Sequence, residues 1–256
     1  SFAAEVGEYR RAAEFFGKLA SLTTPSIRAY MSVLRVHQKC GDWPATLSTF
    51  HDMRRRSVKV DTLVLNIVLA TGVATKRIQE VERLLSEVDS QEMPIADVVS
   101  YNTLIKGYAH ENDLAGAAAV LKRMRKRGLA PNSISFNSTM DAAVRGQMVA
   151  EAWELLREMR AAGLRPDKYT GSILIKGLGK NPTSAEIRDA LRLLGEVIHL
   201  CDGSLKCTLY HVVMTAALQL AEKESKSPLL TQVYAQMREH QVPATAAMHR
   251  RLRELA

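Results

Sequence analysis

The stretch VVSYNTLIKGYAHENDLAGAAAVLKRMRKRGLAPN at residues 98–132 is followed directly by SISFNSTMDAAVRGQMVAEAWELLREMRAAGLRPD at residues 133–167. Both stretches have 35 residues and place an aromatic residue before an Asn near their start, and they close on MRKRGLAPN and MRAAGLRPD. Agreement at one offset predicts internal repeats, and a period of about 20 to 50 residues decides the architecture before any single helix is assigned.

The same period extends over most of the chain. The tetrad LIKG at 104–107 returns at 174–177, two periods later, and a weaker match continues towards both ends. The first residues match the second half of a repeat, so we expect the chain to begin inside a longer array. The predicted divisions are a partial repeat at 1–26, repeats at 27–61, 62–97, 98–132 and 133–167, a repeat with an insertion at 168–205, a degenerate repeat at 206–244 and a terminal helix at 245–256.

Each repeat carries two amphipathic patterns, which predict two helices. In the repeat at 98–132, apolar residues recur at spacings of three and four from Tyr101 to Tyr108 and again from Leu114 to Met124. A helical hairpin with an apolar face cannot bury it alone, so neighbouring hairpins must stack. We therefore predict an all-α, right-handed α-solenoid whose first helices line a concave surface. The recurring methionines follow the helical stripe and are predicted to fill the core: Met53, Met124, Met159 and Met237.

Composition supports a helical, water-soluble chain. Of 256 residues, 46% are hydrophobic and 24% are charged, which excludes a disordered or collagen-like chain, while few glycines and aromatics favour helices over sheet. Lys and Arg exceed Asp and Glu by 35 to 27, and the formal charge of +8 favours a polyanionic partner. The longest apolar stretch, TLVLNIVLATGV, is shorter than the ~20 residues of a membrane span, so none is predicted.

Polar residues recur where helix packing does not demand them. The residue that closes each repeat carries a hydrogen-bonding side chain, and so do most residues at the fifth position. An Asn amide both donates and accepts, so an Asn paired with a nearby Asp or Asn can read the edge of an unstacked base. The alternative is structural, because Asn can bridge helices and a closing Asp can cap the next helix. The fifth residues are Met31, Asn66, Asn102, Asn137 and Ser172, and the closing residues are Asp61, Asp97, Asn132 and Asp167.

Two further columns run in register with the first two. The second residues are mostly broad apolar side chains that can stack on a base, namely Arg28, Leu63, Val99, Ile134 and Tyr169. The thirteenth residues include cations suited to phosphates, namely Lys39, His110, Arg145 and Lys180, with Ala74 as the exception. The cations can alternatively compensate the dipoles of the first helices at their C-terminal ends.

The aromatic-Asn start and the Met-xxx-Gly-xx-Pro close resemble pentatricopeptide repeats, most clearly at 98–167. The resemblance implies single-stranded RNA as partner, one base for each repeat, sandwiched by the second residues. It implies uridine readers at Asn66 with Asp97 and at Asn137 with Asp167, and a pyrimidine reader at Asn102 with Asn132, hence a U-Y-U track over 62–167. Met31 departs from the pattern. Ser172 favours a purine, but the insertion near Asn181 leaves open whether Asp202 or a later residue partners it.

No catalytic constellation is found in the sequence. A glycine-rich phosphate loop, HExxH, GxSxG and the His-x-Glu and Cys-x-x-Cys of zinc deaminases are all missing. The set His199, Cys201, Cys207 and His211 has poor spacing for zinc, so these residues are expected to be ordinary core or surface residues. We predict a non-enzyme without metal or cofactor. The basic runs at 54–56 and 122–127 are predicted to be solvated outer faces.

Two functions follow. The first is binding of organellar transcripts in their stability, processing or translation, since the family that the chain resembles works mainly in mitochondria and plastids. The alternative is a scaffold subunit of a large organellar assembly, such as a ribosome or an enzyme complex, whose groove holds protein or structured RNA. Irregular columns at both ends and a charge of only +8 favour this alternative. A groove that binds a peptide is a third possibility.

Overall fold

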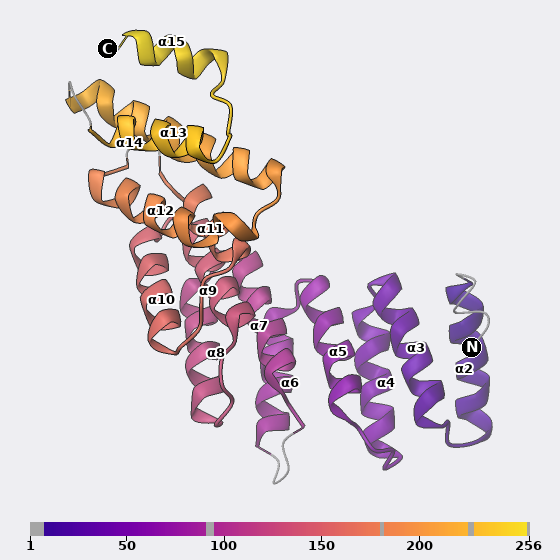
Figure 1. Ribbon diagram of the computed structural model, residues 1–256. Coiled ribbons are helices and arrows are strands. Elements are labelled where there is room, and N and C mark those ends of the chain that lie inside the picture. The colour runs from indigo at the N-terminus through magenta and orange to yellow at the C-terminus, as the bar shows by residue number, and fades with distance from the viewer. Residues whose placement is uncertain (1–7, 91–94, 180–181, 225–227, 255–256) are drawn as a thin grey trace. The chain divides into compact units, whose positions relative to one another are not determined.

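The computed structural model describes residues 8–90, 95–179, 182–224 and 228–254, and all their regular elements are helices (Figure 1). The all-α prediction is confirmed. In chain order the elements are α2 (Tyr9–Leu22), α3 (Ile27–Cys40), α4 (Trp43–Arg55), α5 (Thr62–Ala74), α6 (Ile78–Asp89), α7 (Val98–His110), α8 (Leu114–Lys126), α9 (Ser133–Arg145), α10 (Val149–Ala161), α11 (Lys168–Lys176), α12 (Ser184–Val197), the short 3-10 helix η1 (Ile198–Leu200), α13 (Gly203–Glu224), α14 (Pro228–Glu239) and α15 (Ala246–Glu254).

Side-chain caps determine where α5, α7, α9 and α11 begin. In each of them the preceding Asp or Asn is the N-cap residue, and its side chain accepts a hydrogen bond from a backbone N–H of the first turn. A cap of this kind stabilises a helix by about 1 kcal/mol. The four caps are the closing residues of the predicted repeats, so the capping role considered for that column is present: Asp61, Asp97, Asn132 and Asp167.

Left-handed residues mark the turns between helices. In the four hairpins from α3 to α10, one residue between the two helices has a positive φ, and Gly128 and Gly163 do so after second helices, at 73° and 78°. Left-handed backbone ends a helix and satisfies its last carbonyl groups. The turn residues inside the hairpins lie 35 or 36 positions apart and are Gly41 at 64°, Lys76 at 59°, Asn112 at 58° and Gln147 at 61°.

Helix α11 is shorter than the other first helices. It has 9 residues, whereas α5, α7 and α9 have 13. Gly177 follows it as the C-cap residue, and Gly179 and Pro182 come soon after. Gly lowers helix propensity and Pro cannot donate a helical hydrogen bond, so these residues explain the early end of α11.

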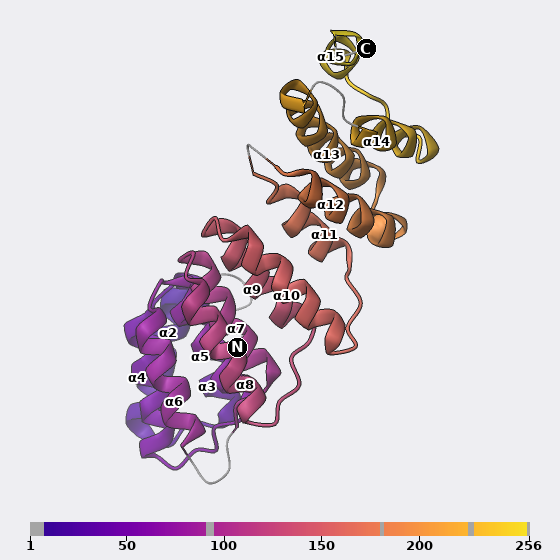
Figure 2. The same ribbon diagram turned by 90° about the vertical axis from the view of Figure 1, so that its left-hand side faces the viewer.

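The helices form two compact units: residues 1–111 with 115–131, called unit 1, and residues 112–114 with 132–256, called unit 2. Within unit 1, α3, α5 and α7 contact one another in order, and α4 and α6 each pack against two of them (Figure 1). Within unit 2, α9, α11 and α13 contact in order, with α10, α12 and α14 packed against them (Figure 2). Each unit is thus a stack of helical hairpins.

The packed stripe is apolar as predicted. Tyr30, Leu65 and Tyr101 are fully buried in unit 1, and Phe136 is fully buried in unit 2. The four methionines of the recurring column are 0% exposed, which confirms that they fill the core. None of the helices in the described part of the chain combines the length and apolar character that a bilayer crossing needs.

The prediction that the basic run at 122–127 is solvated is wrong for Arg123. Its Nε and Nη2 atoms donate to Oδ2 of Asp89 at 2.9 and 2.6 Å, and Asp89 is only 9% exposed. The Tyr101 hydroxyl donates to the same oxygen at 2.6 Å. Removing a carboxylate from water requires such charged and hydrogen-bonding partners. Burial and the Asp89 carboxylate raise the pKa of Tyr101 to about 12.

Candidate nucleic-acid interface

In unit 1 the fifth residue and the closing residue of one predicted repeat meet. Asn66 lies on α5, and Asp97 caps α7 beside it. The Asn66 Nδ2 atom donates to Oδ1 of Asp97 at 3.3 Å, and the Ser100 backbone N–H donates to the same oxygen at 2.9 Å. The contact depends on α5 and α7 lying side by side, so only the stacked hairpins create it.

The same arrangement occurs in unit 2, in the repeat at 133–167. Asn137 on α9 donates through Nδ2 to Oδ1 of Asp167 at 3.1 Å, and Asp167 caps α11. That oxygen also accepts the backbone N–H groups of Tyr169 and Thr170 at 2.9 and 2.8 Å. In neither acid does Oδ2 have a hydrogen-bond partner within the described ranges. Each pair therefore keeps one carboxylate oxygen available.

The other members of these two columns cap helices or are buried or half-buried on the first helices. Asn102 is 6% exposed in unit 1, and Asn132 in unit 2 caps α9 by accepting the Ser135 N–H at 3.1 Å. Asp61 caps α5 by accepting the N–H of Val64 at 2.9 Å. Met31 on α3 and Ser172 on α11 are half-buried.

The second residues of the repeats lie on the surface. Because each of them is in the first turn of its helix, it lies close to the capping acid or amide. Lys168 also places its Nζ atom 5.4 Å from the ring centroid of Tyr169, a cation–π distance. Apolar side chains that stay in water at matching positions are candidates for contact with a flat ligand. Their exposed fractions are 49% for Leu63, 54% for Val99, 49% for Ile134 and 62% for Tyr169, and Arg28 is exposed as well.

The thirteenth residues lie at the other end of the first helices, about 12 Å along the axis from the fifth residues. Lys39, His110 and Arg145 are exposed in the last turns of α3, α7 and α9, where they also complement the helix dipole. Arg145 pairs with Asp141, Nε to Oδ2, at 2.8 Å. Lys180 lies outside the described residues.

Two sets of residues were missed by the sequence analysis. Three of the five ninth residues are the cations Arg35, Lys106 and Lys176, and the other two are Ala70 and Asp141. The three cations are exposed one helical turn beyond the fifth position and form no ion pair within the part of the chain that is described. Their i+4 spacing from the fifth column was the signal that could have identified them. The second set is the buried hydroxyls of Ser100 and Thr170, each of which bonds the Asn of the preceding repeat.

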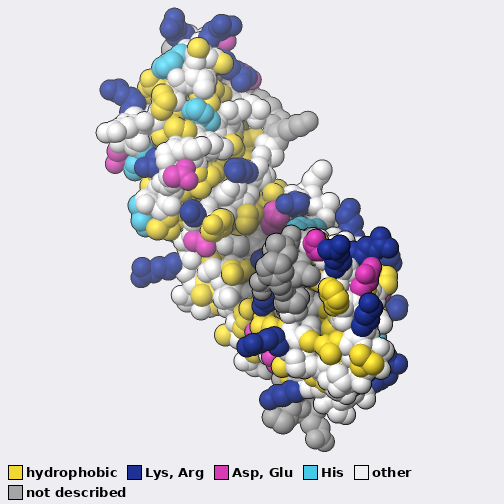
Figure 3. All heavy atoms as spheres, turned by 90° about the vertical axis from the view of Figure 1, so that its right-hand side faces the viewer, with side chains coloured by type: hydrophobic (Ala, Val, Ile, Leu, Met, Phe, Trp, Pro, Cys, Tyr) yellow, Lys and Arg dark blue, Asp and Glu magenta, His cyan; other side chains and the backbone are white. Residues whose placement is uncertain are grey.

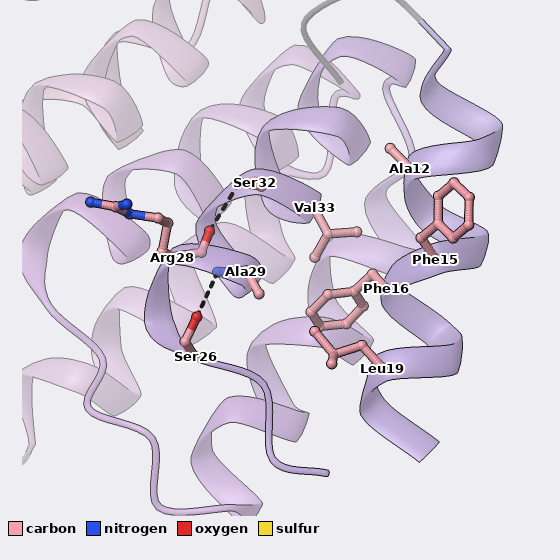
Figure 4. Close-up of a pocket in the computed structure, with 9 residues that line it drawn as sticks. All are labelled: Ala12, Phe15, Phe16, Leu19, Ser26, Arg28, Ala29, Ser32 and Val33. Atoms are coloured by element: carbon pink, nitrogen blue, oxygen red, sulfur yellow. Dashed lines mark hydrogen bonds between the residues drawn. The ribbon is translucent and has the colours of Figure 1, made fainter. Parts of the chain in front are cut away.

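A pocket of about 320 Å³ lies between α2 and α3 of unit 1, and Arg28 of the second-residue column is one of its lining residues. Phe15, Phe16 and Leu19 of α2 and Val33 of α3 line it, and Figure 4 shows Arg28 directed away from the phenyl rings. Its lining is mainly apolar and holds no acid–base pair.

Two of the four cysteines and histidines at 199–211 bond to backbone carbonyls far from one another in the sequence. The Cys201 thiol donates to the carbonyl of Val197 at 3.4 Å, and Nε2 of His211 lies 2.8 Å from the carbonyl of Pro243. Burial raises the pKa of the Cys201 thiol. Among the residues that the structure describes, no three His, Cys, Asp or Glu side chains gather as metal ligands would.

The surface carries the positive charge that the sequence indicates. On the face shown in Figure 3, Lys and Arg side chains lie beside exposed hydrophobic ones, and Asp and Glu are sparse. A mixture of cations and exposed apolar side chains suits a partner that has both phosphates and flat bases.

Comparison with known proteins agrees with this geometry. Residues 96–145 and 131–180 match the PPR repeat family. A chloroplastic pentatricopeptide repeat-containing protein of Arabidopsis thaliana (At3g09650) is 32% identical over 124 residues, which are 48% of this chain and 16% of that protein. The small ribosomal subunit protein mS78 (rPPR3a) of the same plant is 30% identical over 97 residues, which are 38% of this chain and 24% of that protein. The matched part is thus less than a third of either relative.

Solved structures match over nearly the whole chain. The pentatricopeptide repeat protein PPR10 from maize has a TM-score of 0.56 at 22% identity, covering 98% of this chain and 40% of that one. PPR10 in complex with an 18-nt psaJ RNA element has a TM-score of 0.63 at 17% identity, covering 99% and 39%. At these identities the likeness concerns the fold. Residues 96–180 thus match repeats of the PPR repeat family, and the 35-residue period and the stacked hairpins extend the same architecture to the other described helices.

Proposed function

We propose that the chain binds single-stranded RNA, one base for each repeat, and that binding rather than catalysis is its mechanism. The observation that carries the proposal is the pair formed by a fifth-position Asn and a closing Asp, seen in both units at 3.3 and 3.1 Å. After that bond, one amide N–H and one carboxylate oxygen of each pair remain available for a ligand.

This combination suits the Watson–Crick edge of uracil. Uracil presents an N3–H donor next to a carbonyl acceptor, so the free Asp oxygen accepts from the base while the Asn N–H donates to it. Single-stranded RNA exposes this edge, whereas a duplex hides it. The proposed track is U-Y-U over the repeats at 62–167, with Asn66 and Asn137 facing the two uridines.

Stacking and phosphate contacts complete the proposed mode of binding. The exposed second residues Leu63, Val99, Ile134 and Tyr169 would hold the base planes, a contribution of about 1–3 kcal/mol per base for an aromatic platform. The cations of the ninth and thirteenth positions lie along the same helices and would hold the phosphates.

The proposed targets are transcripts of an organelle, whose stability, processing or translation would depend on the bound protein. Relatives named as chloroplastic support this placement, and PPR10 supports the choice of ligand because it was solved with an RNA element. The chain spans less than a third of the first curated relatives, so the proposal concerns the repeats themselves.

A direct test measures the affinity of the chain for short labelled RNAs whose central bases are U-C-U or A-A-A. We expect the chain to prefer U-C-U and Asn137→Ala to reduce that preference about tenfold, since one base-directed hydrogen bond is lost. Ser138→Ala, on the same helix and half-buried, is the matched control and should keep the preference. Equal affinity for both RNAs would contradict base reading.

A second candidate function is a scaffold role inside a large organellar assembly. It is favoured by the similarity to small ribosomal subunit protein mS78 and to mS79. In that case the repeats would hold structured RNA or protein. Recovery of the chain with partner proteins after nuclease treatment, together with RNA binding that ignores sequence, would favour this candidate over the first.

A further inference from the structure

A buried hydroxyl lies behind each Asn–Asp pair that the structure describes. Ser100, on the helix that Asp97 caps, places Oγ 2.6 Å from Oδ1 of Asn66. Thr170, on the helix that Asp167 caps, places Oγ1 2.8 Å from Oδ1 of Asn137. Both hydroxyl residues are 0% exposed. The same three-residue arrangement therefore occurs independently in unit 1 and in unit 2.

The hydrogen bonds of the hydroxyl determine where its single proton goes. Thr170 Oγ1 accepts the backbone N–H of Asp167 at 3.1 Å, so its proton must point to another acceptor. Two acceptors are in reach, Oδ1 of Asn137 at 2.8 Å and Oδ1 of Asp167 at 3.0 Å. The Asp oxygen already accepts two backbone N–H groups and the Asn amide, so the Asn carbonyl is the acceptor in need of a donor.

This bond fixes the orientation of the Asn side chain. With its carbonyl bound to the hydroxyl, Asn137 can only turn its Nδ2 towards Asp167 and the ligand. If the amide turned by half a rotation, its carbonyl oxygen would face Oδ1 of Asp167, so two acceptors would meet and the bond from Nδ2 to Asp167 would be lost, which is costly in a protein interior. The hydroxyl therefore makes the Asn a donor, and not an acceptor, towards a base.

In the sequence, hydroxyl residues at the third position occur together with the Asn that they would orient, and not with every helix cap. The third residue of a repeat is a hydroxyl residue wherever the preceding repeat has Asn at its fifth position: Ser100 after Asn66, Ser135 after Asn102 and Thr170 after Asn137. After Met31, which has no amide to orient, the third residue is Val64. Helix α5 is still capped by Asp61, so the cap itself does not require the hydroxyl.

We propose that Ser100 and Thr170 are positioning residues that set base specificity from behind, by holding the Asn of the preceding repeat with its N–H directed to the base. The proposal rests on the proposed RNA binding. It adds to the Asn–Asp pair a third residue that touches no base and yet decides which hydrogen-bonding pattern the repeat presents.

The test compares Thr170→Val, which keeps the shape and removes the hydroxyl, with Thr170→Ser, which keeps it. We expect Thr170→Val to lower the discrimination between uridine and the other bases at that repeat about fivefold to tenfold, and Thr170→Ser to restore it. Thr139→Val is the matched control, because Thr139 is equally buried but its hydroxyl bonds only the backbone carbonyl of Ser135. It should leave discrimination unchanged.

A second measurement needs no RNA. In the NMR spectrum of the free protein, the side-chain amide signals of Asn137 should exchange slowly with solvent, and faster in Thr170→Val but not in Thr170→Ser. Unchanged amide signals and unchanged discrimination in Thr170→Val would overturn the proposal. If the wild-type chain shows no base preference but Thr170→Val still speeds the exchange of the Asn137 amide, the proposed function is overturned, whereas the hydrogen-bond triad of Asn137, Asp167 and Thr170 is retained. Ser100→Ala tests the same triad in unit 1.

Discussion

At the scale of single residues, hydrogen bonds between neighbouring repeats hold the side chains of the candidate RNA-binding site in place. The Asn–Asp pairs could be predicted as columns from the sequence, because their positions recur at one period. The hydroxyls of Ser100 and Thr170 could not, since a Ser or Thr three residues after an Asp indicates an ordinary cap. The partner of Arg123 was also hidden, because Asp89 lies 34 residues away and only folding brings them together.

Tyr101 and Tyr30 are buried and each donate a hydrogen bond to a carboxylate, and they give the protein a pH response. Burial and a bonded carboxylate raise the pKa values of Tyr101 and Tyr30 to about 12, from an ordinary value of 10.0. Between pH 10 and 12 the unfolded chain releases these protons while the folded chain keeps them, so the free energy of unfolding falls as the pH rises. Tyr101→Phe should make this decline shallower, by at most ~1.4 kcal/mol per pH unit. Urea denaturation across that pH range measures it, and an unchanged slope would contradict the assignment.

At the scale of elements, the helical pattern predicted which segments are helices better than where they end. Helix α11 ends early because glycines and Pro182 follow it, whereas α13 has 22 residues and runs from Gly203 to Glu224. Periodicity finds the buried stripe of a helix, but its ends depend on caps and on contacts with neighbours. The caps at the closing residues were foreseen only as an alternative to base reading.

Two glycines allow the effect of backbone conformation on stability to be measured without a change in side-chain packing. Gly163 has a φ of 78° and Gly195 lies inside α12, and a Cβ atom would meet nothing within 4 Å at either position. We expect Gly163→Ala to lower the free energy of unfolding by about 1 kcal/mol, since an L-residue is strained in left-handed backbone. Gly195→Ala should raise it by about 0.5–1 kcal/mol through helix propensity. Chemical denaturation of the two variants provides the measurement, and effects of the same sign would refute the argument.

At the scale of the molecule, the period together with the two amphipathic patterns in each repeat was enough to predict an all-helical array of hairpins. The division into two compact units was not predictable, because the repeats on either side of residues 111–132 are the most regular in the chain. The regular spacing defines the repeats of the array, but it contains no information about how the repeats divide into compact units.

The positive charge of the chain leads to a prediction for binding. For single-stranded RNA, the logarithm of the affinity should fall with the logarithm of salt concentration by about 0.7 for each phosphate contacted. Lys106→Ala should reduce that slope by about this amount and weaken all sequences alike. Lys122→Ala removes the same charge from an exposed position on the second helix α8 and serves as control. Identical slopes for the two variants would remove the ninth position from the proposed binding surface.

Under the proposed mode of RNA binding, each closing residue both caps a helix and faces a base, which restricts how this protein could be redirected to a different target. Asp61, Asp97, Asn132 and Asp167 each start the next helix, so a substitution chosen to change the preferred letter must also begin that helix. Only a few side chains do so well, chiefly Asp, Asn, Ser and Thr. Few residue types can therefore occupy the closing position without a loss of stability. An array with other residues at this position would lose stability in proportion to the number of repeats changed.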